Sequence, residues 1–152
     1  MTEVHNKATR SRNMAAIRGR DTTPEIVVRK ALHGAGLRYR LHSRLPGKPD
    51  LVFPKYRAAV FVHGCFWHYH DCPRFKWPGG ENAAFWRDKL ARNKVRDIAV
   101  DGQLAAIGLR RFVVWECAVT GRAKMSVAEI VDKISTWLAS SSEKGEVAGR
   151  WQ

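Results

Sequence analysis

The chain has 152 residues, of which 45% are hydrophobic, which is enough for one domain with a packed core and excludes a wholly disordered protein. Lys and Arg number 27 against 14 Asp and Glu, so the formal net charge of +13 favours nucleic acid over an acidic membrane surface as the partner. The sequence has no apolar run long enough to cross a membrane, and its first residues lack the apolar segment of a secretory signal. We therefore expect a cytoplasmic protein without a membrane partner.

The basic residues are clustered. Residues 1–20 carry five Lys and Arg against a single Glu, so we expect this segment to contact the nucleic acid. Residues 21–139 contain the apolar patterns of one folded domain. The polar stretch SSSEKGEVAGRWQ at 140–152 predicts a disordered tail.

Residues 21–36 are the first expected helix. Thr22 and Glu25 match a capping box, and Pro24 suits the first turn. The apolar stripe of this helix and the glycines expected to end it are Val28, Ala31, Leu32 and Ala35, then Gly34 and Gly36.

Three expected strands follow. LRYRLH at 37–42 alternates as a strand with one buried face does, and LVF at 51–53 is short. AAVFV at 58–62 is a continuous apolar run, which is typical of a central strand, and it leads directly to His63.

The second half predicts a helix, a strand and a helix. From 83 to 107 the period is helical. We expect Phe85, Leu90, Ile98, Leu104 and Ile107 to face the core, and Arg87, Asn93, Lys94 and Asp97 to face outwards. RFVVWEC at 111–117 predicts a buried strand, and a capping box of Ser126 and Glu129 opens an amphipathic helix through Leu138. This order predicts an α/β fold with a central mixed sheet flanked by helices.

The stretch VHGCFWHYHDC at 62–72 holds three metal-binding side chains, Cys65, His70 and Cys72. Cys117, the remaining cysteine, would complete a Cys₃His set, which is a tetrahedral zinc complement without an open position. The alternative is that Cys117 is simply a small buried apolar residue. Because the zinc assignment uses every cysteine, we expect one structural zinc per chain.

His63 and His68 remain for other chemistry. Asp50 stands at the head of the strand at 51–53, and the neighbouring strand ends at His63, so a Mg²⁺ ligand and a proton-transferring group would lie together. Structural roles are the alternatives to these functional ones. Pro-Asp is a common turn dipeptide, and a single histidine is more often structural than catalytic. The capping role already explains Glu25.

Five motifs occur in one order along the chain. They are KATRSRNM (7–14), LPGKPDLVF (45–53), VFVHGCFWHYHDC (60–72), FW...K...N...RD (85–97) and VVWECA (113–118). Over residues 5–138 this pattern resembles the very short patch repair (Vsr) endonucleases, which nick DNA beside T:G mismatches. The resemblance implies a restriction-endonuclease-like core and Mg²⁺-dependent cleavage 5′ of the mismatched thymine, the first step of repair after 5-methylcytosine is deaminated.

The resemblance also implies residue roles. Asp50 and the main-chain carbonyl of Val62 would bind Mg²⁺, His68 would activate the water, His63 would assist at the phosphate, and Glu25 would orient the His68 side. The zinc ligands that it implies are the four already named. Two departures are present. FVH stands where the parent superfamily has an acidic residue and a lysine, and Val62 replaces an expected threonine, which matters little for a backbone ligand.

Aromatic and basic side chains are the expected DNA contacts. Phe66 and Trp67 would form a wedge between base pairs, where a mismatch makes unstacking least costly, and Trp86 would join it. From the residues alone, a satellite core around the zinc is the favoured reading of Phe66 and Trp67, and Trp86 could be helix core. Lys89 and Asn93 match family positions that read the mismatch, although a solvated helix face is the commoner fate of such residues.

In the N-terminal segment, Met14 resembles a side chain that enters the opposite groove, and otherwise would be an ordinary packing residue. Candidate phosphate contacts are Arg10, Arg12, Arg18, Lys76, Arg87 and Arg92.

Two other functions fit much of the pattern: a non-catalytic zinc-containing DNA-binding module, and a restriction-type nuclease that cuts matched duplex. The binding module would give Asp50 and His68 no functional role. For the favoured function we expect a monomer in the bacterial cytoplasm, associated with the nucleoid when acting, with mismatch-repair proteins as candidate partners.

Overall fold

A computed structural model describes residues 21–41 and 43–151. Four strands form one mixed sheet in the order β1-β2-β3-β4. They are β1 (Leu51–Phe53), β2 (Ala58–His63), β3 (Arg110–Trp115) and β4 (Lys144–Val147). A short 3-10 helix, η1 (Pro54–Tyr56), turns the chain from β1 into antiparallel pairing with β2, while β2–β3 and β3–β4 are parallel. The predicted central mixed sheet is confirmed.

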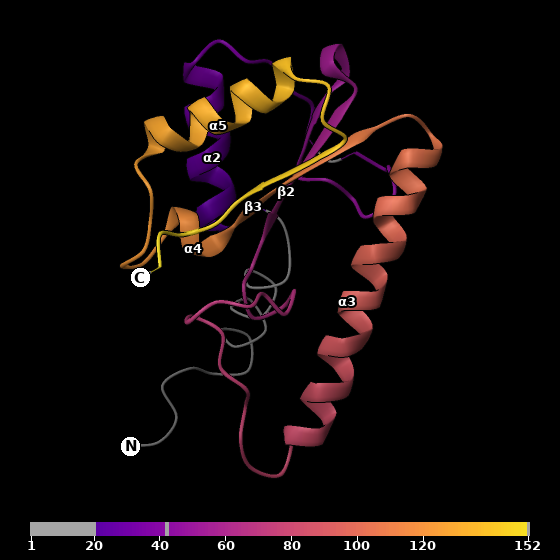
Figure 1. The fold of residues 1–152 in the computed structure, drawn as a ribbon, viewed down its shortest axis with the longest axis vertical. Coiled ribbons are helices and arrows are strands. Elements are labelled where there is room, and N and C mark those ends of the chain that lie inside the picture. Colours follow the sequence, from indigo (N-terminus) through magenta and orange to yellow (C-terminus); the bar gives the residue numbers. More distant parts are fainter. Residues whose placement is uncertain (1–20, 42, 152) are drawn as a thin grey trace.

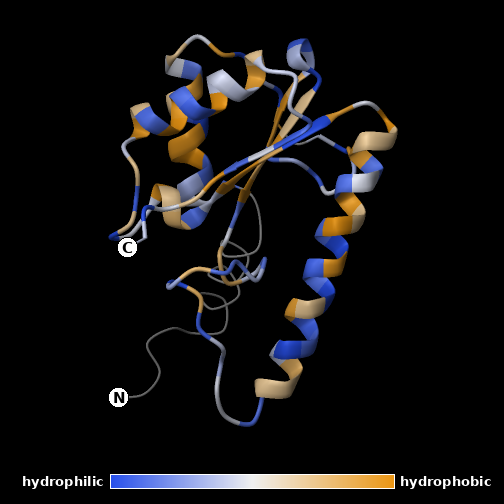
Figure 2. Cartoon of the chain, viewed as in Figure 1, coloured by the Kyte–Doolittle hydropathy of each residue, from blue (hydrophilic) through white to orange (hydrophobic). Residues whose placement is uncertain are grey.

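Helices lie on both faces of this sheet (Figure 1). One face carries α2 (Thr23–Gly34), the single turn α4 (Glu116–Val119) and α5 (Val127–Ala139), whose apolar side chains form the larger core with alternate strand residues. The long helix α3 (Ala83–Ala106) runs past the other face and contributes Leu104 to the second core. Figure 2 shows apolar residues along the central strands, with hydrophilic residues at some strand positions, whereas α3 carries many hydrophilic residues along its length.

Local sequence signals explain where two helices begin. Ser126 and Glu129 form the complete capping box expected at the start of α5. At α2, the Thr22 hydroxyl accepts a hydrogen bond from the Glu25 N–H at 3.5 Å. The Glu25 carboxylate instead accepts one from the Asp21 N–H at 2.9 Å, so this capping box is only half formed.

Several predicted boundaries are wrong. The predicted strand at 37–42 is not formed over its described part, residues 37–41, where Arg40 makes a single isolated bridge with Val52. β3 ends at Trp115, which places Cys117 in α4. On α3, Leu90 and Leu104 are fully buried, but only a narrow face of this helix meets the sheet. The other expected core residues are therefore exposed: Phe85 at 55%, Ile98 at 66% and Ile107, which caps the end of the helix, at 48%.

The prediction of a disordered tail is wrong for residues 144–147, because they form β4. Phe112, Val113 and Val114 of β3 pair with Gly145, Glu146 and Val147. A Cβ atom at Gly145 would lie 2.6 Å from the Trp137 ring and 2.7 Å from the Phe112 ring, so only glycine allows this close approach. Four residues that include a glycine and two charged side chains carry no recognisable strand pattern.

None of the helices described, over residues 21–41 and 43–151, combines the length and the apolar character that spanning a membrane demands.

Since β4 completes the sheet, its one buried side chain contributes to stability. Val147 is 4% exposed, so Val147→Ala should lower the free energy of unfolding by roughly 1 to 3 kcal/mol in urea titrations. Glu143→Ala, an exposed position just before β4, is the control and should change little. Equal stability of the two variants would mean that this segment does not pack in solution.

Candidate functional site

The pairing of β2 with its two neighbours, β1 and β3, brings two groups of chemically active residues to one edge of the sheet. His63 pairs with Trp115 at the last position of both strands. The loop that follows β2 carries Cys65, and α4, which follows β3, carries Cys117. Residues distant in sequence therefore meet directly beyond the carboxyl ends of neighbouring strands.

The first group is a four-residue cluster. The side-chain atoms of Cys65, His70, Cys72 and Cys117 that could bind a metal all lie within 4.8 Å of one another, and Cys117 Sγ is 3.8 Å from His70 Nδ1. Tetrahedral zinc with Zn–S bonds of about 2.3 Å and Zn–N bonds of about 2.0 Å separates its ligand atoms by roughly 3.5 to 3.8 Å. The donor set and its spacing therefore fit a closed zinc site.

The surroundings of this cluster favour a bound cation. Burial raises the pKa of the Cys65 thiol, and negative charge on Cys117 and Cys72 raises it further, which outweighs the backbone hydrogen bond from Cys117. Burial lowers the pKa of His70, so its ring is neutral and can act as a ligand. The ring of His70 stacks on Trp115, with centroids 4.0 Å apart. Three crowded sulfurs can be thiolates together only if a positive ion neutralises them.

The second group contains two carboxyls. Asp50 precedes β1, and its Oδ2 accepts a hydrogen bond from the Val62 N–H at 2.6 Å. Within a strand, the N–H and C=O of one residue point to the same side. The Val62 carbonyl is therefore directed to the side on which Asp50 lies, as expected for a shared Mg²⁺ site.

The Asp50 carboxyl is strongly perturbed. Burial raises its pKa from 3.8 to about 7, the Val62 N–H opposes this, and repulsion and hydrogen bonding from Glu25 add to it. Glu25 is 7% exposed, and it is the one buried charged residue in the described part of the chain. Two desolvated carboxyls at one point form a site where a divalent cation is favoured. One or two carboxylates, with phosphate oxygens and water, are a usual Mg²⁺ environment.

The histidines lie beside this pair. The rings of His63 and His68 stack with centroids 3.6 Å apart and planes parallel within 3°. His68 Nδ1 lies 2.8 Å from Asp97 Oδ2. Although these three side chains are close enough to share a metal, parallel ring planes cannot direct both in-plane lone pairs at one ion, so this arrangement suits proton transfer instead.

The surroundings of His63 disfavour its charged form. Burial lowers the pKa of His63 well below its ordinary value, and positive charge on His68 lowers it further. Two stacked imidazolium rings would repel each other, so His63 is neutral whenever His68 carries a proton. The Asp97 carboxylate lies against the His68 ring and gives it an anionic partner.

A turn of the backbone at Tyr69 directs His68 and His70 to different groups. Tyr69 has a left-handed backbone, with φ 52°, which lets His68 join His63 and Asp97 while His70 joins the cysteines. Helix α3 holds the loop: the Asn93 side chain donates to the Trp67 carbonyl at 3.0 Å, and Lys94 Nζ donates to the Tyr69 carbonyl at 3.3 Å. Asn93 and Lys94 therefore contact the loop rather than solvent alone, contrary to the prediction.

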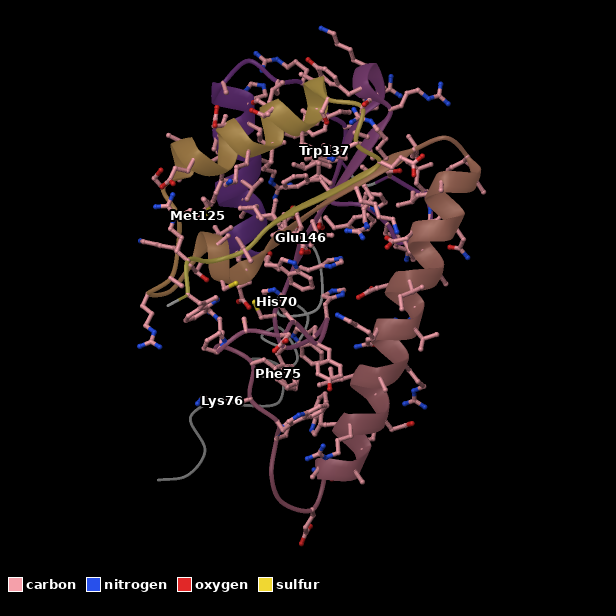
Figure 3. All side chains as sticks on the ribbon, viewed as in Figure 1. His70, Phe75, Lys76, Met125, Trp137 and Glu146 are labelled. Atoms are coloured by element: carbon pink, nitrogen blue, oxygen red, sulfur yellow. The ribbon has the colours of Figure 1, made fainter. Side chains whose placement is uncertain are left out.

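The aromatic side chains of the loop form a half-buried cluster. Trp86 packs edge-on against Phe66 and Trp67, with centroids 5.4 and 5.6 Å away. Phe66 stacks on Phe75 at 5.9 Å, and Phe75 stacks on Tyr69 at 5.2 Å. In Figure 3, His70, Phe75 and Lys76 follow one another away from the sheet along this loop. The packing matches the satellite-core alternative, while the partial exposure of Phe66, Trp67 and Trp86 leaves ring surface for another molecule.

An open groove of about 1270 Å³ connects the two carboxyls, the histidine pair and the aromatic loop. Its lining includes the predicted residues Glu25, Asp50, Val62, His63, His68, Phe66, Trp67 and Lys89. Asn93 lies at a smaller cavity on the other side of the histidines. The predicted contacts Met14, Arg10 and Arg12 fall outside the described residues.

Two carboxylates lie elsewhere than predicted. Glu25 was expected on the His68 side, but its side chain meets Asp50. The carboxylate that holds His68 is Asp97, which was expected to face outwards. A signal was present, since Asp97 follows Leu90 by seven residues and precedes Leu104 by seven, which places all three on one helix face.

Comparisons with known proteins agree on one family. The family model for the DNA mismatch endonuclease Vsr matches residues 2–74. The DNA mismatch endonuclease Vsr of Escherichia coli (strain K12) is 40% identical over 148 residues, which cover 97% of this chain and 94% of that protein.

Two nicking enzymes are also similar. The type II nicking enzyme V.NmeAIP of Neisseria meningitidis is 42% identical over 124 residues, covering 81% of this chain and 88% of the enzyme. The type II nicking enzyme V.XorIIP of Xanthomonas oryzae is 40% identical over 135 residues, covering 87% of this chain and 98% of the enzyme.

The raised pKa of Asp50 predicts a pH-dependent stability. A carboxyl with a folded pKa of about 7 and an ordinary value of 3.8 holds a proton in the folded state that the unfolded state has lost. Stability should therefore fall as pH rises from about 4 to about 7, by on the order of 2 kcal/mol between pH 5 and 8. Asp50→Asn should remove most of this dependence in buffer without added Mg²⁺.

The measurement is urea unfolding at both pH values. Asp88→Asn, an exposed position on α3 that pairs with Arg92, is the matched control and should keep the wild-type dependence. If Asp50→Asn loses as much stability as the wild type does, this carboxyl titrates normally.

Proposed function

This chain belongs to the DNA mismatch endonuclease Vsr family, and we propose that it nicks one strand of duplex DNA 5′ to the thymine of a T:G mismatch in a Mg²⁺-dependent reaction. Members of this family are nucleases that hydrolyse phosphodiester bonds. The observation that supports the proposal is the groove lined by Asp50, Glu25 and His68, with Asp97 bonded to His68 from behind.

Asp50 and the Val62 carbonyl would hold Mg²⁺, with the Glu25 carboxyl against Asp50. The chemistry that a bound Mg²⁺ supplies is neutralisation of the negative charge that develops on the phosphoryl oxygens. The two carboxylates repel each other when both are ionised, so a bound cation would stabilise the ionised pair.

His68 is the proposed general base. With Nδ1 donating to Asp97, Nε2 is the nitrogen that can accept a proton from the attacking water. The water oxygen bonds to phosphorus as its proton passes to His68. The bond from phosphorus to the leaving oxygen breaks, and that oxygen takes up a proton from solvent water. Asp97 stabilises the resulting imidazolium, and the neutral ring of His63 shields its face and can donate to the phosphate.

The aromatic loop is the proposed mismatch sensor. Phe66, Trp67 and Trp86 are brought together next to the groove, and their exposed ring surface suits insertion beside a weakly stacked base pair. Lys89 lines the same groove. Reading of the mismatch by Asn93 would require its side chain to exchange the Trp67 carbonyl for a base edge. Met14, Arg10 and Arg12 would contact DNA from the N-terminal segment.

Zinc is the proposed structural cofactor, held by Cys65, His70, Cys72 and Cys117. It would tie the aromatic loop to α4 and so keep the wedge at a constant distance from the histidine pair. We further propose that the protein acts as a monomer on the bacterial nucleoid, after deamination of 5-methylcytosine, with mismatch-repair proteins as candidate partners.

A strand-specific nicking assay tests the function. Zinc-loaded protein and Mg²⁺ are mixed with end-labelled duplexes that differ only in T:G against C:G at one position. We expect a single nick 5′ to the thymine, absent with the matched duplex and without Mg²⁺. Asp50→Ala should abolish nicking and keep binding to the mismatched duplex. Equal cutting of the matched duplex would favour a restriction-type nuclease, and tight binding without any nick would favour a binding module.

The role of Asp97 as a positioning residue has its own test. Asp97→Asn keeps the shape of the side chain but removes the charge that stabilises protonated His68, so the single-turnover nicking rate should fall roughly 10²- to 10⁴-fold. Mismatch affinity and thermal stability should stay near wild type. Asp88→Asn, on the exposed face of the same helix, should nick normally. A rate within a few-fold of wild type would show that His68 does not depend on Asp97.

A further inference from the structure

The chain that follows β4 reaches the cysteine cluster. The Gly149 N–H donates a hydrogen bond to Cys117 Sγ at 3.2 Å. Cys117 is fully buried, and its sulfur also faces His70. A hydrogen bond from a backbone N–H to a thiolate is charge-assisted, and therefore stronger than one between neutral groups.

This contact requires a residue without a side chain. A Cβ atom at position 149 would lie 2.6 Å from the Cys117 carbonyl oxygen and 2.9 Å from the Ala123 Cβ. The backbone of Gly149 is not in the left-handed region, so glycine is needed here for space and not for its conformational freedom. The next residue fixes the segment, because the Arg150 N–H donates to the Ala123 carbonyl at 2.7 Å.

The same segment supports a second ligand. Glu146 of β4 accepts a hydrogen bond from Trp115 Nε1 at 3.1 Å, and the ring of Trp115 stacks on His70. In Figure 3, the labelled Glu146 on β4 and His70 in the loop lie close together in the view. Trp151 and the partly buried Cys72 both pack against the core cluster that contains Cys65 and Cys117. Residues 144–151 therefore contact Cys117 directly, reach His70 indirectly through Trp115, and form part of the apolar cover.

We infer that residues 144–151 are an integral part of the zinc site, and that the Gly149 N–H is the positioning contact that retains the metal by stabilising the Cys117 thiolate. The inference rests on the proposed zinc site and deepens it. Outer partners that orient and polarise metal ligands commonly change metal affinity roughly 10- to 100-fold when they are removed.

The test compares two glycines of the same segment. Gly149→Ala pushes the chain away from Cys117, whereas Gly145→Ala overpacks the opposite face of the sheet, against Trp137 and Phe112. Gly145→Ala therefore measures what general loosening of β4 does to the zinc site. A third variant that ends at Ala148 keeps β4 and deletes the Gly149 N–H, which serves if Gly149→Ala does not fold.

The readouts do not depend on nicking. They are the zinc content of the purified full-length chain, the half-time of zinc transfer to a chelating dye, and the visible spectrum after substitution with Co²⁺, which reports on the tetrahedral ligand field. We expect one zinc per wild-type chain. Gly149→Ala and the shortened variant should release zinc roughly 10- to 100-fold faster than wild type, and Gly145→Ala should release it within a few-fold of wild type.

The outcomes separate the inference from its premise. A folded wild-type chain without zinc would overturn the zinc site itself. One zinc per chain, with equal release rates for Gly149→Ala and Gly145→Ala, would overturn only the role of Gly149. Faster release confined to Gly149→Ala and the shortened variant, with an altered Co²⁺ spectrum, would support it.

Discussion

The pairing of β2 with both of its neighbours is the constraint on which both sites depend. Parallel strands end at the same edge of a sheet, so the loop after β2 and the turn after β3 emerge side by side. This places Cys65 near Cys117, and the Cys65 N–H donates a hydrogen bond to Glu116, which is 51 positions further along the chain. The antiparallel pairing of β2 with β1 places Asp50 against Val62, the residue before His63. A shift of β2 in register would disturb both groups at once.

Both sites concentrate negative charge away from water. Asp50 and Glu25 share one desolvated point, and three cysteine sulfurs share another. In the absence of cations, burial raises the pKa values of Asp50 and Cys65 and so favours the protonated form of these two groups. The fold thus holds two arrangements whose stability depends on cations of different chemistry: oxygen ligands for a hard ion, and sulfur with nitrogen for zinc.

Helix α3 connects the chemistry to the aromatic loop through polar contacts rather than through a large apolar interface. Only Leu90 and Leu104 of this helix are fully buried. Between them, Asn93 and Lys94 bond the backbone of the loop, and Asp97 bonds His68. One helix face therefore positions both the proposed sensor and the proposed base. Because His68 belongs to the same loop, a displacement of the loop on DNA would also displace His68.

The sequence by itself determined the elements with strong local signals and the chemistry of short, dense motifs. The apolar run of β2, the capping box of α5, and the ligand types around Cys65 and Asp50 could all be read from it, since they depend on neighbours in the chain. Tertiary structure alone decided the rest. β4 exists because β3 offers an unpaired edge, Glu25 meets Asp50 across two elements, and Asp97 faces His68 because α3 lies against the loop. Each of these contacts includes a segment or side chain that is polar in the sequence. A polar pattern does not indicate a partner by itself, because the partner is distant in the chain and only the fold brings it close.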